Sequence, residues 1–146
     1  MIIADSMLGK LSRYLRMIGY DVRYVESDKD DSYIISISEN NLLLTRDRQL
    51  HERVDNSILV GSFRSIEQLD EIRGRLPHPE HGFMELCSIC GQTLSKVNSK
   101  EGLPDYVNKS ATEIFYCSMC NKYYWNGSHT ENFRKMMERI GLEIHN

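Results

Sequence analysis

The sequence lacks any apolar run close to the roughly 18 residues that a membrane-spanning helix requires. Its N-terminus also lacks the basic start and the long apolar stretch of a signal peptide. From these two absences we expect a cytoplasmic protein without a membrane partner. The sequence also has no low-complexity segment and no repeat at a fixed period, which excludes solenoids and disordered tails.

A surplus of positive charge is missing as well. The 146 residues carry a formal net charge of -3, so no overall electrostatic attraction draws the chain to nucleic acid. Residues 1–80 hold 11 basic and 14 acidic side chains, whereas residues 81–146 hold 7 of each. Any binding of nucleic acid must therefore depend on a local basic patch.

Cysteine is scarce, but its spacing is informative. The four cysteines form two Cys-x-x-Cys pairs with 26 residues between them, and each pair is followed by a residue suited to positive φ, Gly91 or Asn121. Two such knuckles in a reducing cytoplasm are typical of a tetrahedral zinc site, with a redox dithiol or buried free cysteines as the alternatives. The expected ligands of this structural zinc ion are Cys87, Cys90, Cys117 and Cys120.

Residues 1–76 alternate short apolar runs with longer stretches of helical spacing. Four runs predict strands, at 1–4, 21–25, 41–45 and 57–60. After the first run, four apolar side chains share one helical face: Leu8, Leu11, Leu15 and Ile18. Gly19 is expected to end this helix. Helical spacing is weaker in 31–39 and 66–76. The alternation predicts an α/β domain with a small, mostly parallel sheet flanked by helices.

The alternation breaks between residues 76 and 82, where two prolines and a glycine occur within seven residues. We therefore predict a first domain over 1–78 and a second over 79–146. The second is expected to be a zinc ribbon with a short C-terminal helix near 132–140. It has few apolar residues, and a segment of this kind commonly needs a metal ion or a disulfide to stabilise it.

Three aspartates are candidates for a catalytic site. Asp5 and Asp47 closely follow predicted strands, and Asp31 lies between the second strand and the second helix, which places all three at the carboxyl edge of the sheet. Asp28 and Asp30 compete with Asp31 for the third position. Converging carboxylates suit Mg²⁺ or Mn²⁺, which activates water for attack on a phosphodiester. The alternative is that these aspartates cap helices or form turns.

Basic side chains near the first aspartate are candidates for contacts with RNA. Lys10, Arg13 and Arg16 occupy the face of the first helix opposite its apolar stripe. We expect them to project outward together, where they hold phosphates or are simply solvated. Arg46, directly before Asp47, is a further candidate.

The second part contributes aromatic and polar candidates. Tyr124 and Trp125 follow the second knuckle and are expected to pack over the metal site. His129 lies in a polar Gly-Ser-His context that gives it little reason to be buried. We expect His129 to donate to a phosphate or to stack on a base.

Several of these motifs occur in an order that resembles one family. They are residues 5–21 (DSMLGKLSRYLRMIGYD), 44–47 (LTRD), the two cysteine knuckles and 124–129 (YWNGSH). The chain resembles the Mut-seven C-terminal RNase domain family, a PIN-like nuclease fold with an appended zinc ribbon, over nearly its whole length. The resemblance implies a metal-dependent ribonuclease, with Asp5, Asp31 and Asp47 at the acidic positions of the PIN-like site.

Three functions stay open at this point. The first is a ribonuclease that cuts single-stranded or looped RNA with the help of Mg²⁺ or Mn²⁺. The second is a non-catalytic module in which the ribbon and the basic helix bind RNA or a ribosomal partner. The third is a toxin-like or regulatory protein whose acidic pocket binds another chain. A homo-oligomer and a protein partner are both compatible with the sequence.

Overall fold

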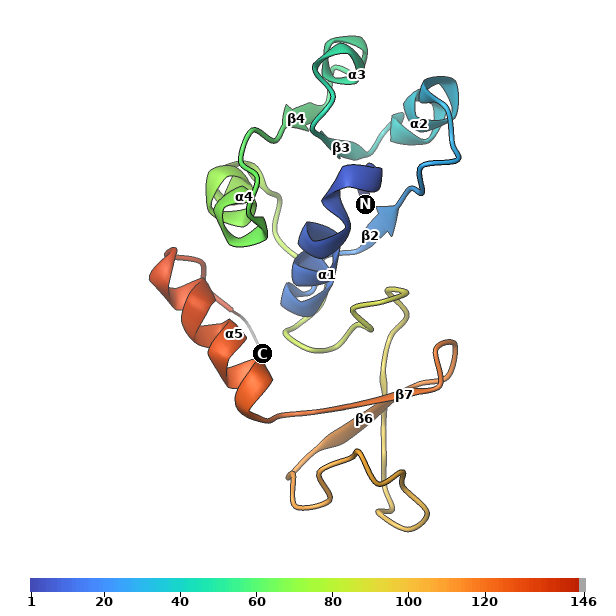
Figure 1. The fold of residues 1–146 in the computed structure, drawn as a ribbon, viewed down its shortest axis with the longest axis vertical. Helices are drawn as coiled ribbons and strands as arrows, with labels where there is room; N and C mark the ends of the chain where they lie inside the picture. The colour runs from blue at the N-terminus through green and yellow to red at the C-terminus, as the bar shows by residue number, and fades with distance from the viewer. Residues whose placement is uncertain (145–146) are drawn as a thin grey trace.

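The first part of the chain folds around a four-stranded sheet, as a computed structural model of the protein shows (Figure 1). The model describes residues 1–144. All strand pairs are parallel, in the order β2-β1-β3-β4. The strands are β1 (Ile2–Ala4), β2 (Val22–Tyr24), β3 (Leu42–Thr45) and β4 (Ser57–Leu59). Each lies within one of the four apolar runs, so the predicted parallel α/β architecture is confirmed.

Helices cover both faces of this sheet. They are α1 (Gly9–Ile18), α2 (Asp31–Ser38), α3 (Arg48–Arg53) and α4 (Ser65–Ile72), with short 3-10 helices η1 (Ser6–Leu8) and η2 (Arg73–Arg75). Ile2 packs against α1 and α4 on one face, whereas its neighbour Ile3 packs against α2 and α3 on the other. Because both faces are covered, the two central strands, β1 and β3, are almost continuously apolar.

Gly19 ends α1 in the predicted left-handed conformation, with a φ of +119°. Its N–H group donates to the carbonyl oxygens of Leu15 and Arg16, both at 3.1 Å. A Cβ atom at this position would lie 2.0 Å from the carbonyl oxygen of His81, whose N–H group donates to the carbonyl oxygen of Gly19 at 3.0 Å. Glycine is therefore required both by the helix end and by the chain that packs against it.

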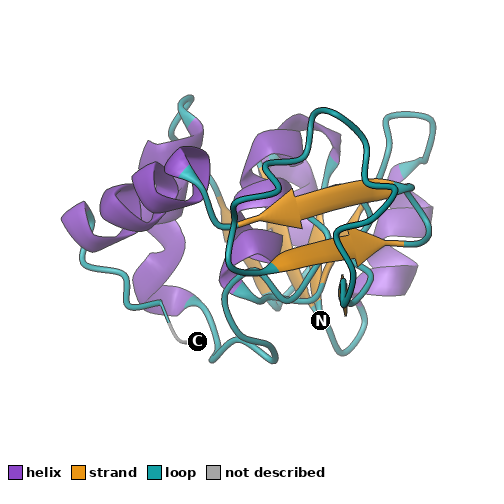
Figure 2. Cartoon of the chain, turned by 90° about the horizontal axis from the view of Figure 1, so that it is seen from below, coloured by secondary structure: helices purple, strands orange, loops and turns teal. Residues whose placement is uncertain are grey.

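The second part contains a small antiparallel sheet in the order β5-β6-β7. Its strands are β5 (Ser95–Lys96), β6 (Ile114–Cys117) and β7 (Lys122–Trp125). Figure 2 shows the last two as antiparallel arrows in front of the first part. A small apolar cluster that includes Leu103, Val107 and Ile114 lies beside this sheet. Such a limited core agrees with the expectation that a metal site stabilises this part.

Helix α5 (Ser128–Arg139) returns from the second sheet to the first part, where it lies below α4 in Figure 1. Phe133 and Met137 are buried in the same apolar cluster as Leu15 and Ile72. The division at residue 78 stays a prediction, but the two parts share this core. The last two residues of the predicted second domain, 145–146, lie outside the described residues. Within 1–144, none of the helices has the length and hydropathy needed to cross a bilayer.

The start of α5 differs from the prediction. The apolar spacing indicated a helix from about residue 132, but the helix begins at Ser128. The hydroxyl group of Thr130 accepts a hydrogen bond from the N–H group of Gly127 at 2.9 Å and donates to its carbonyl oxygen at 2.8 Å. This cap stabilises a first turn that carries no apolar stripe, so the hydrophobic pattern could not reveal it.

Candidate metal centre and catalytic edge

The four cysteines lie together and form no disulfide. The sulfur atoms of Cys87 and Cys120 are 3.9 Å apart, those of Cys90 and Cys117 are 3.5 Å apart, and all four lie within 4.8 Å of one another. Four sulfurs at the usual Zn–S distance of about 2.3 Å form a tetrahedron with edges of about 3.8 Å. The donor set and its spacing therefore fit a zinc ion with four protein ligands.

The backbone of both knuckles has the predicted turn. Gly91 and Asn121 have φ angles of +82° and +52°, which confirms the expectation of positive φ after each pair. The N–H group of Gly91 donates to the carbonyl oxygen of Cys87 at 2.8 Å. In the second knuckle, the N–H group of Cys120 points at the sulfur of Cys117 at 3.4 Å. These turns bring both thiols of each pair to the same side.

Electrostatics make the thiols of Cys87 and Cys120 unequal. Burial raises the pKa of Cys87, but hydrogen bonds from the Tyr124 hydroxyl and from the N–H groups of Cys90 and Ile89 outweigh burial and lower this pKa to about 6. Hydrogen bonding to the neighbouring thiols raises the pKa of Cys120 to about 12. The thiolate of Cys87 therefore forms readily, and its charge opposes the ionisation of Cys120. A bound divalent cation offsets this repulsion, as structural zinc does.

Arg16 does not project into solvent, so the prediction for this residue was wrong. Its side chain is buried, and Nε and Nη2 donate to the carbonyl oxygen of Val22 at 3.2 and 2.8 Å. Nη1 donates to the carbonyl oxygens of Ser88 and Ile89, at 3.3 and 2.6 Å. Arg16 thus ties α1 to the first cysteine knuckle. Helical spacing shows only that a residue lies off the apolar stripe, not which other part of the chain covers it.

Asp5 and Asp47 lie at the ends of neighbouring strands. Asp5 directly follows β1, Asp47 follows β3 by two residues, and these strands pair in parallel through Ala4 and Leu44. The buried hydroxyl of Thr45 donates to Oδ2 of Asp5 and accepts from the N–H group of Asp47 at 3.0 Å. The structure thus brings both aspartates to the carboxyl edge of the sheet, as the strand pattern predicted.

The two carboxylates also have structural partners. Asp5 is 6% exposed, and its Oδ1 accepts from the N–H group of Met7 at 3.2 Å. Asp47 is exposed, and its Oδ1 caps α3 by accepting from the N–H groups of Gln49 and Leu50, at 2.9 and 3.3 Å. Within residues 1–144, Oδ2 of Asp47 has no hydrogen-bond partner. The cap that the sequence offered as an alternative is therefore present, and one oxygen of Asp47 stays available to a cation.

Asp31 lies apart from this pair. It is the first residue of α2, and its Oδ2 is 3.7 Å from Nη1 of Arg53. Arg53 is the last residue of α3, at the opposite end of that helix from Asp47. In the described part of the chain, the cysteines alone bring three or more ligand atoms within 4.8 Å of one another. The three aspartates do not form such a group.

The two aspartates that compete with Asp31 have local roles. Asp30 caps α2, because its Oδ1 accepts from the N–H group of Tyr33 at 2.9 Å. Asp28 is exposed and forms an ion pair of 3.8 Å with Lys29. Neither contact joins these side chains to Asp5 or Asp47.

Comparison with known protein families identifies the family of this chain. The model of the Mut7-C RNAse domain matches residues 1–137, which include both knuckles and most of α5. The chain belongs to the Mut7-C RNAse domain family. This confirms the resemblance seen in the sequence motifs. Neither the curated proteins nor the solved structures gave a match.

An exposed aromatic side chain, that of Phe63, lies at the same sheet edge as Asp47. Phe63 follows β4, the neighbour of β3, and is 86% exposed. The guanidinium carbon of Arg46 lies 4.4 Å from the centre of its ring, and Nη1 of Arg46 donates to the carbonyl oxygen of Ser62 at 2.6 Å. Sequence reasoning missed Phe63, for which the only signal was its position just after the fourth strand.

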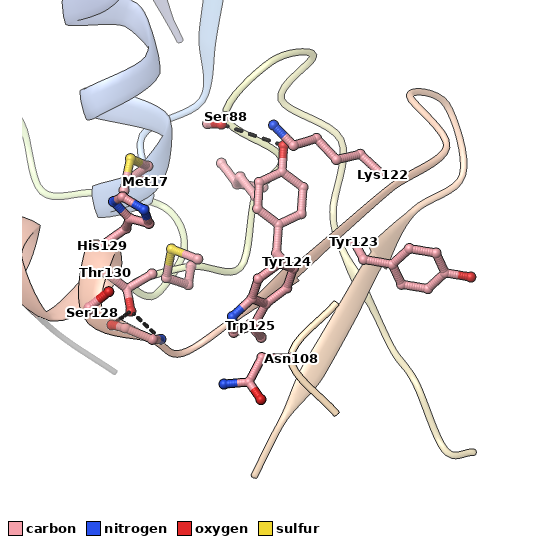
Figure 3. A pocket seen from close by; sticks show the side chains of 13 residues that line it. Met17, Ser88, Asn108, Lys122, Tyr123, Tyr124, Trp125, Ser128, His129 and Thr130 are labelled. Carbon is pink, nitrogen blue, oxygen red and sulfur yellow. Dashed lines mark hydrogen bonds between the residues drawn. The ribbon is translucent and has the colours of Figure 1, made fainter. Parts of the chain in front are cut away.

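His129 lies away from the two carboxylates. It is exposed in the first turn of α5 and lines a pocket of about 430 Å³ together with Met17, near the end of α1 (Figure 3). Asp5 lies before the start of α1, so the helix separates His129 from the carboxylates. Tyr124 contacts the sulfur of Cys87 at 3.0 Å, which confirms its packing on the metal site. Trp125 also lines this pocket.

Proposed function

We propose that the protein is a metal-dependent ribonuclease with a PIN-like first part, which hydrolyses RNA phosphodiesters at the carboxyl edge of the parallel sheet. One observation carries the proposal: Asp5 and Asp47 follow neighbouring parallel strands, with Thr45 hydrogen-bonded between them. Reactive groups of open parallel sheets gather at this edge. Membership of an RNase domain family supports RNA as the substrate.

Asp5 and Asp47 are the residues that would hold Mg²⁺ or Mn²⁺. Mg²⁺ in enzymes is commonly bound by one or two carboxylates, with water and substrate phosphate completing its shell. When bound, the ion supplies Lewis acidity and lowers the pKa of a coordinated water molecule. We assign the third acidic position to Asp31, whose carboxylate must leave Arg53 to join the other two.

The surrounding residues orient these carboxylates before any substrate binds. Thr45 and the N–H group of Met7 hold the two oxygens of Asp5, and the start of α3 holds Asp47. Fixed ligands need little reorganisation on binding, which favours both affinity and rate. We therefore assign Thr45 a positioning role rather than a catalytic one.

Contacts with RNA are proposed on the exposed side chains near this edge. Lys10 and Arg13 are exposed on α1, which begins four residues after Asp5. Arg46 and Phe63 follow the neighbouring strands β3 and β4 and offer a cation and a ring at the same edge. Phosphates would bind to the cations, and a base would stack on the ring.

The zinc ion is proposed to be structural. All four thiolates come from the protein, so no position stays open for a substrate. Through Arg16, the first knuckle is hydrogen-bonded to α1. A reducing cytoplasm, where we place the protein, keeps such thiols available for the metal ion. A homo-oligomer or a protein partner stays a prediction.

The test is replacement of Asp47 by Asn, which preserves size and capping but removes the charge. We expect RNA cleavage in Mg²⁺ or Mn²⁺ to fall by more than the roughly 10- to 100-fold that loss of an outer-shell partner costs. Stability should hold, because asparagine also caps α3. The matched control is Asp55→Asn, an exposed aspartate just after α3. Cleavage at the wild-type rate by Asp47→Asn would disprove the proposal.

A non-catalytic RNA- or ribosome-binding module is the second candidate. It is favoured by the finding that each candidate carboxylate already has a structural partner: Thr45 for Asp5, the first turn of α3 for Asp47 and Arg53 for Asp31. Uptake of Mn²⁺ separates the two functions. Mn²⁺ binding by the wild type that is lost in Asp47→Asn supports the ribonuclease. If the protein binds RNA, leaves it intact and takes up no Mn²⁺, the module is supported.

A further inference from the structure

The pocket of about 430 Å³ lies where three segments distant in the sequence meet. Met17 comes from the end of α1, Tyr124 and Trp125 come from β7, and His129 comes from the first turn of α5. In Figure 3 the side chains of Met17 and His129 face those of Tyr124 and Trp125 across the pocket. The pocket is lined chiefly by apolar and aromatic groups, which is typical of ligand sites.

The rings of Tyr124 and Trp125 form an aromatic wall of the pocket, and neighbouring residues hold this wall in place. The hydroxyl of Tyr124 lies 3.0 Å from the sulfur of Cys87 and 3.4 Å from the hydroxyl of Ser88, so the metal site fixes this ring. A Cβ atom at Gly127 would lie 3.2 Å from Nε1 of Trp125, so glycine makes room for the indole edge. Within residues 1–144, Nε1 has no hydrogen-bond partner. The wall thus presents fixed ring surfaces and one available donor.

The charge around the pocket is opposite to that of the whole chain. The chain has a net charge of -3, but none of the residues that line the pocket is acidic. The Nζ atom of Lys122 lies 5.3 Å from the centre of the Tyr124 ring, and His129, which also lines the pocket, is exposed. The N–H groups of the first turn of α5 add partial positive charge. These features favour a ligand with a flat ring and a phosphate.

We propose that this pocket binds one unstacked base of single-stranded RNA between His129 and the rings of Tyr124 and Trp125, with the adjoining phosphate at Lys122. Proteins recognise unpaired RNA by stacking its bases on aromatic and histidine side chains. The choice of RNA rests on the proposed function. Helix α1 spans about 15 Å, so this base is several nucleotides from the bond that is cut at Asp5 and Asp47.

Trp125 is the only tryptophan in the chain, so its fluorescence reports directly from the pocket. The probes are an octamer of adenylate and an abasic ribose-phosphate octamer, added without Mg²⁺ or Mn²⁺ so that no strand is cut. We expect the adenylate octamer to quench the fluorescence to saturation and the abasic octamer to leave it unchanged. Stacking is worth about 1–3 kcal/mol per base, so His129→Ala should raise the Kd about 5- to 150-fold.

The matched control is Asn132→Ala, an exposed residue of α5 that does not line the pocket. It should leave the Kd unchanged. Equal quenching by both octamers, no quenching by either, or an unchanged Kd in His129→Ala would overturn the proposal. The fluorescence test needs no cleavage, so it does not depend on ribonuclease activity. If the pocket binds adenylate but the protein cuts no RNA, the ribonuclease proposal fails and this proposal stands.

Discussion

The hydroxyl group of Thr45 donates a hydrogen bond to the carboxylate of Asp5, from one strand of the sheet to its neighbour. Thr45 is fully buried, and the same oxygen accepts from the N–H group of Asp47. A single side chain therefore orients one candidate ligand and anchors the backbone of the other.

Replacement of Thr45 by Val keeps the shape of the side chain and removes this link. The carboxylate of Asp5 and the N–H group of Asp47 each lose a partner, which should lower the free energy of unfolding by about 1–3 kcal/mol in urea denaturation. RNA cleavage should fall about 10- to 100-fold, as for other partners that orient metal ligands. The control is Thr112→Val at an exposed position. Equal stability and activity in the two variants would contradict the positioning role.

Metal analysis of the purified protein should find about one zinc ion per chain, in keeping with four thiolate ligands. Cys117→Ser should lose this zinc and unfold the second part. Because Phe133 and Met137 of α5 pack in the core of the first part, the melting temperature of the first part should fall as well. Amide hydrogen exchange, measured separately for the two parts, shows both the unfolding of the second part and the loss of stability in the first. The control is Ser118→Ala, an exposed residue between the two cysteines of the same knuckle. Full zinc content in Cys117→Ser would show that the ligands are wrongly assigned.

Glu71 predicts a dependence of stability on pH. Glu71 is exposed, and the desolvation that its carboxylate still undergoes raises its pKa. Hydrogen bonds from the N–H groups of Gly61 and Ser62 and from the Ser62 hydroxyl together outweigh desolvation, so the pKa lies below its ordinary value. A lowered pKa in the folded state contributes stability above the ordinary glutamate pKa of about 4.3. This contribution is lost as pH falls through the folded-state value.

Glu71→Gln should therefore be less stable than the wild type at pH 7, and the difference should shrink at low pH. Urea denaturation at pH 7 and at low pH measures the free energy of unfolding of the variant and of the wild type. The matched control is Glu67→Gln, an exposed position on the same helix. A difference between wild type and Glu71→Gln that is the same at both pH values would show that the loop before Phe63 is not held by this charge.

Binding of RNA by a chain of net charge -3 should depend on local cations, and therefore on salt. Each phosphate contact contributes about -0.7 to the slope of log affinity against log salt for a single strand. Because Arg16 is buried, the exposed pair to replace is Lys10 and Arg13. Their double replacement by Gln should flatten the slope by about 1.4.

The control for this double variant replaces Lys109 and Lys135, two exposed lysines outside α1, by Gln. The two double variants lose the same charge, so a difference between them reports position rather than net charge. An unchanged slope in the α1 variant would move the binding surface to Arg46 and His129.

Local patterns were enough to predict the framework of this protein. The four strands lie within the four apolar runs, α1 ends at Gly19, and positive φ follows both cysteine pairs. These features depend on a few neighbouring residues: apolar side chains that need burial, and glycine or asparagine where the chain turns back. The positions of Asp5 and Asp47 just after predicted parallel strands also placed both aspartates at one edge of the sheet.

Tertiary contacts decided the rest. Arg16 is buried because the first knuckle packs on α1, and Asp31 faces Arg53 because α2 and α3 lie together. Phe63 is exposed although its type favours burial. Each outcome depends on which distant segment covers a side chain, and spacing along one helix or strand carries no information about that. The sequence alone predicted the four strands of the first sheet, helix α1 and the cluster of four cysteines. Packing between distant segments determined which charged and aromatic side chains stay exposed.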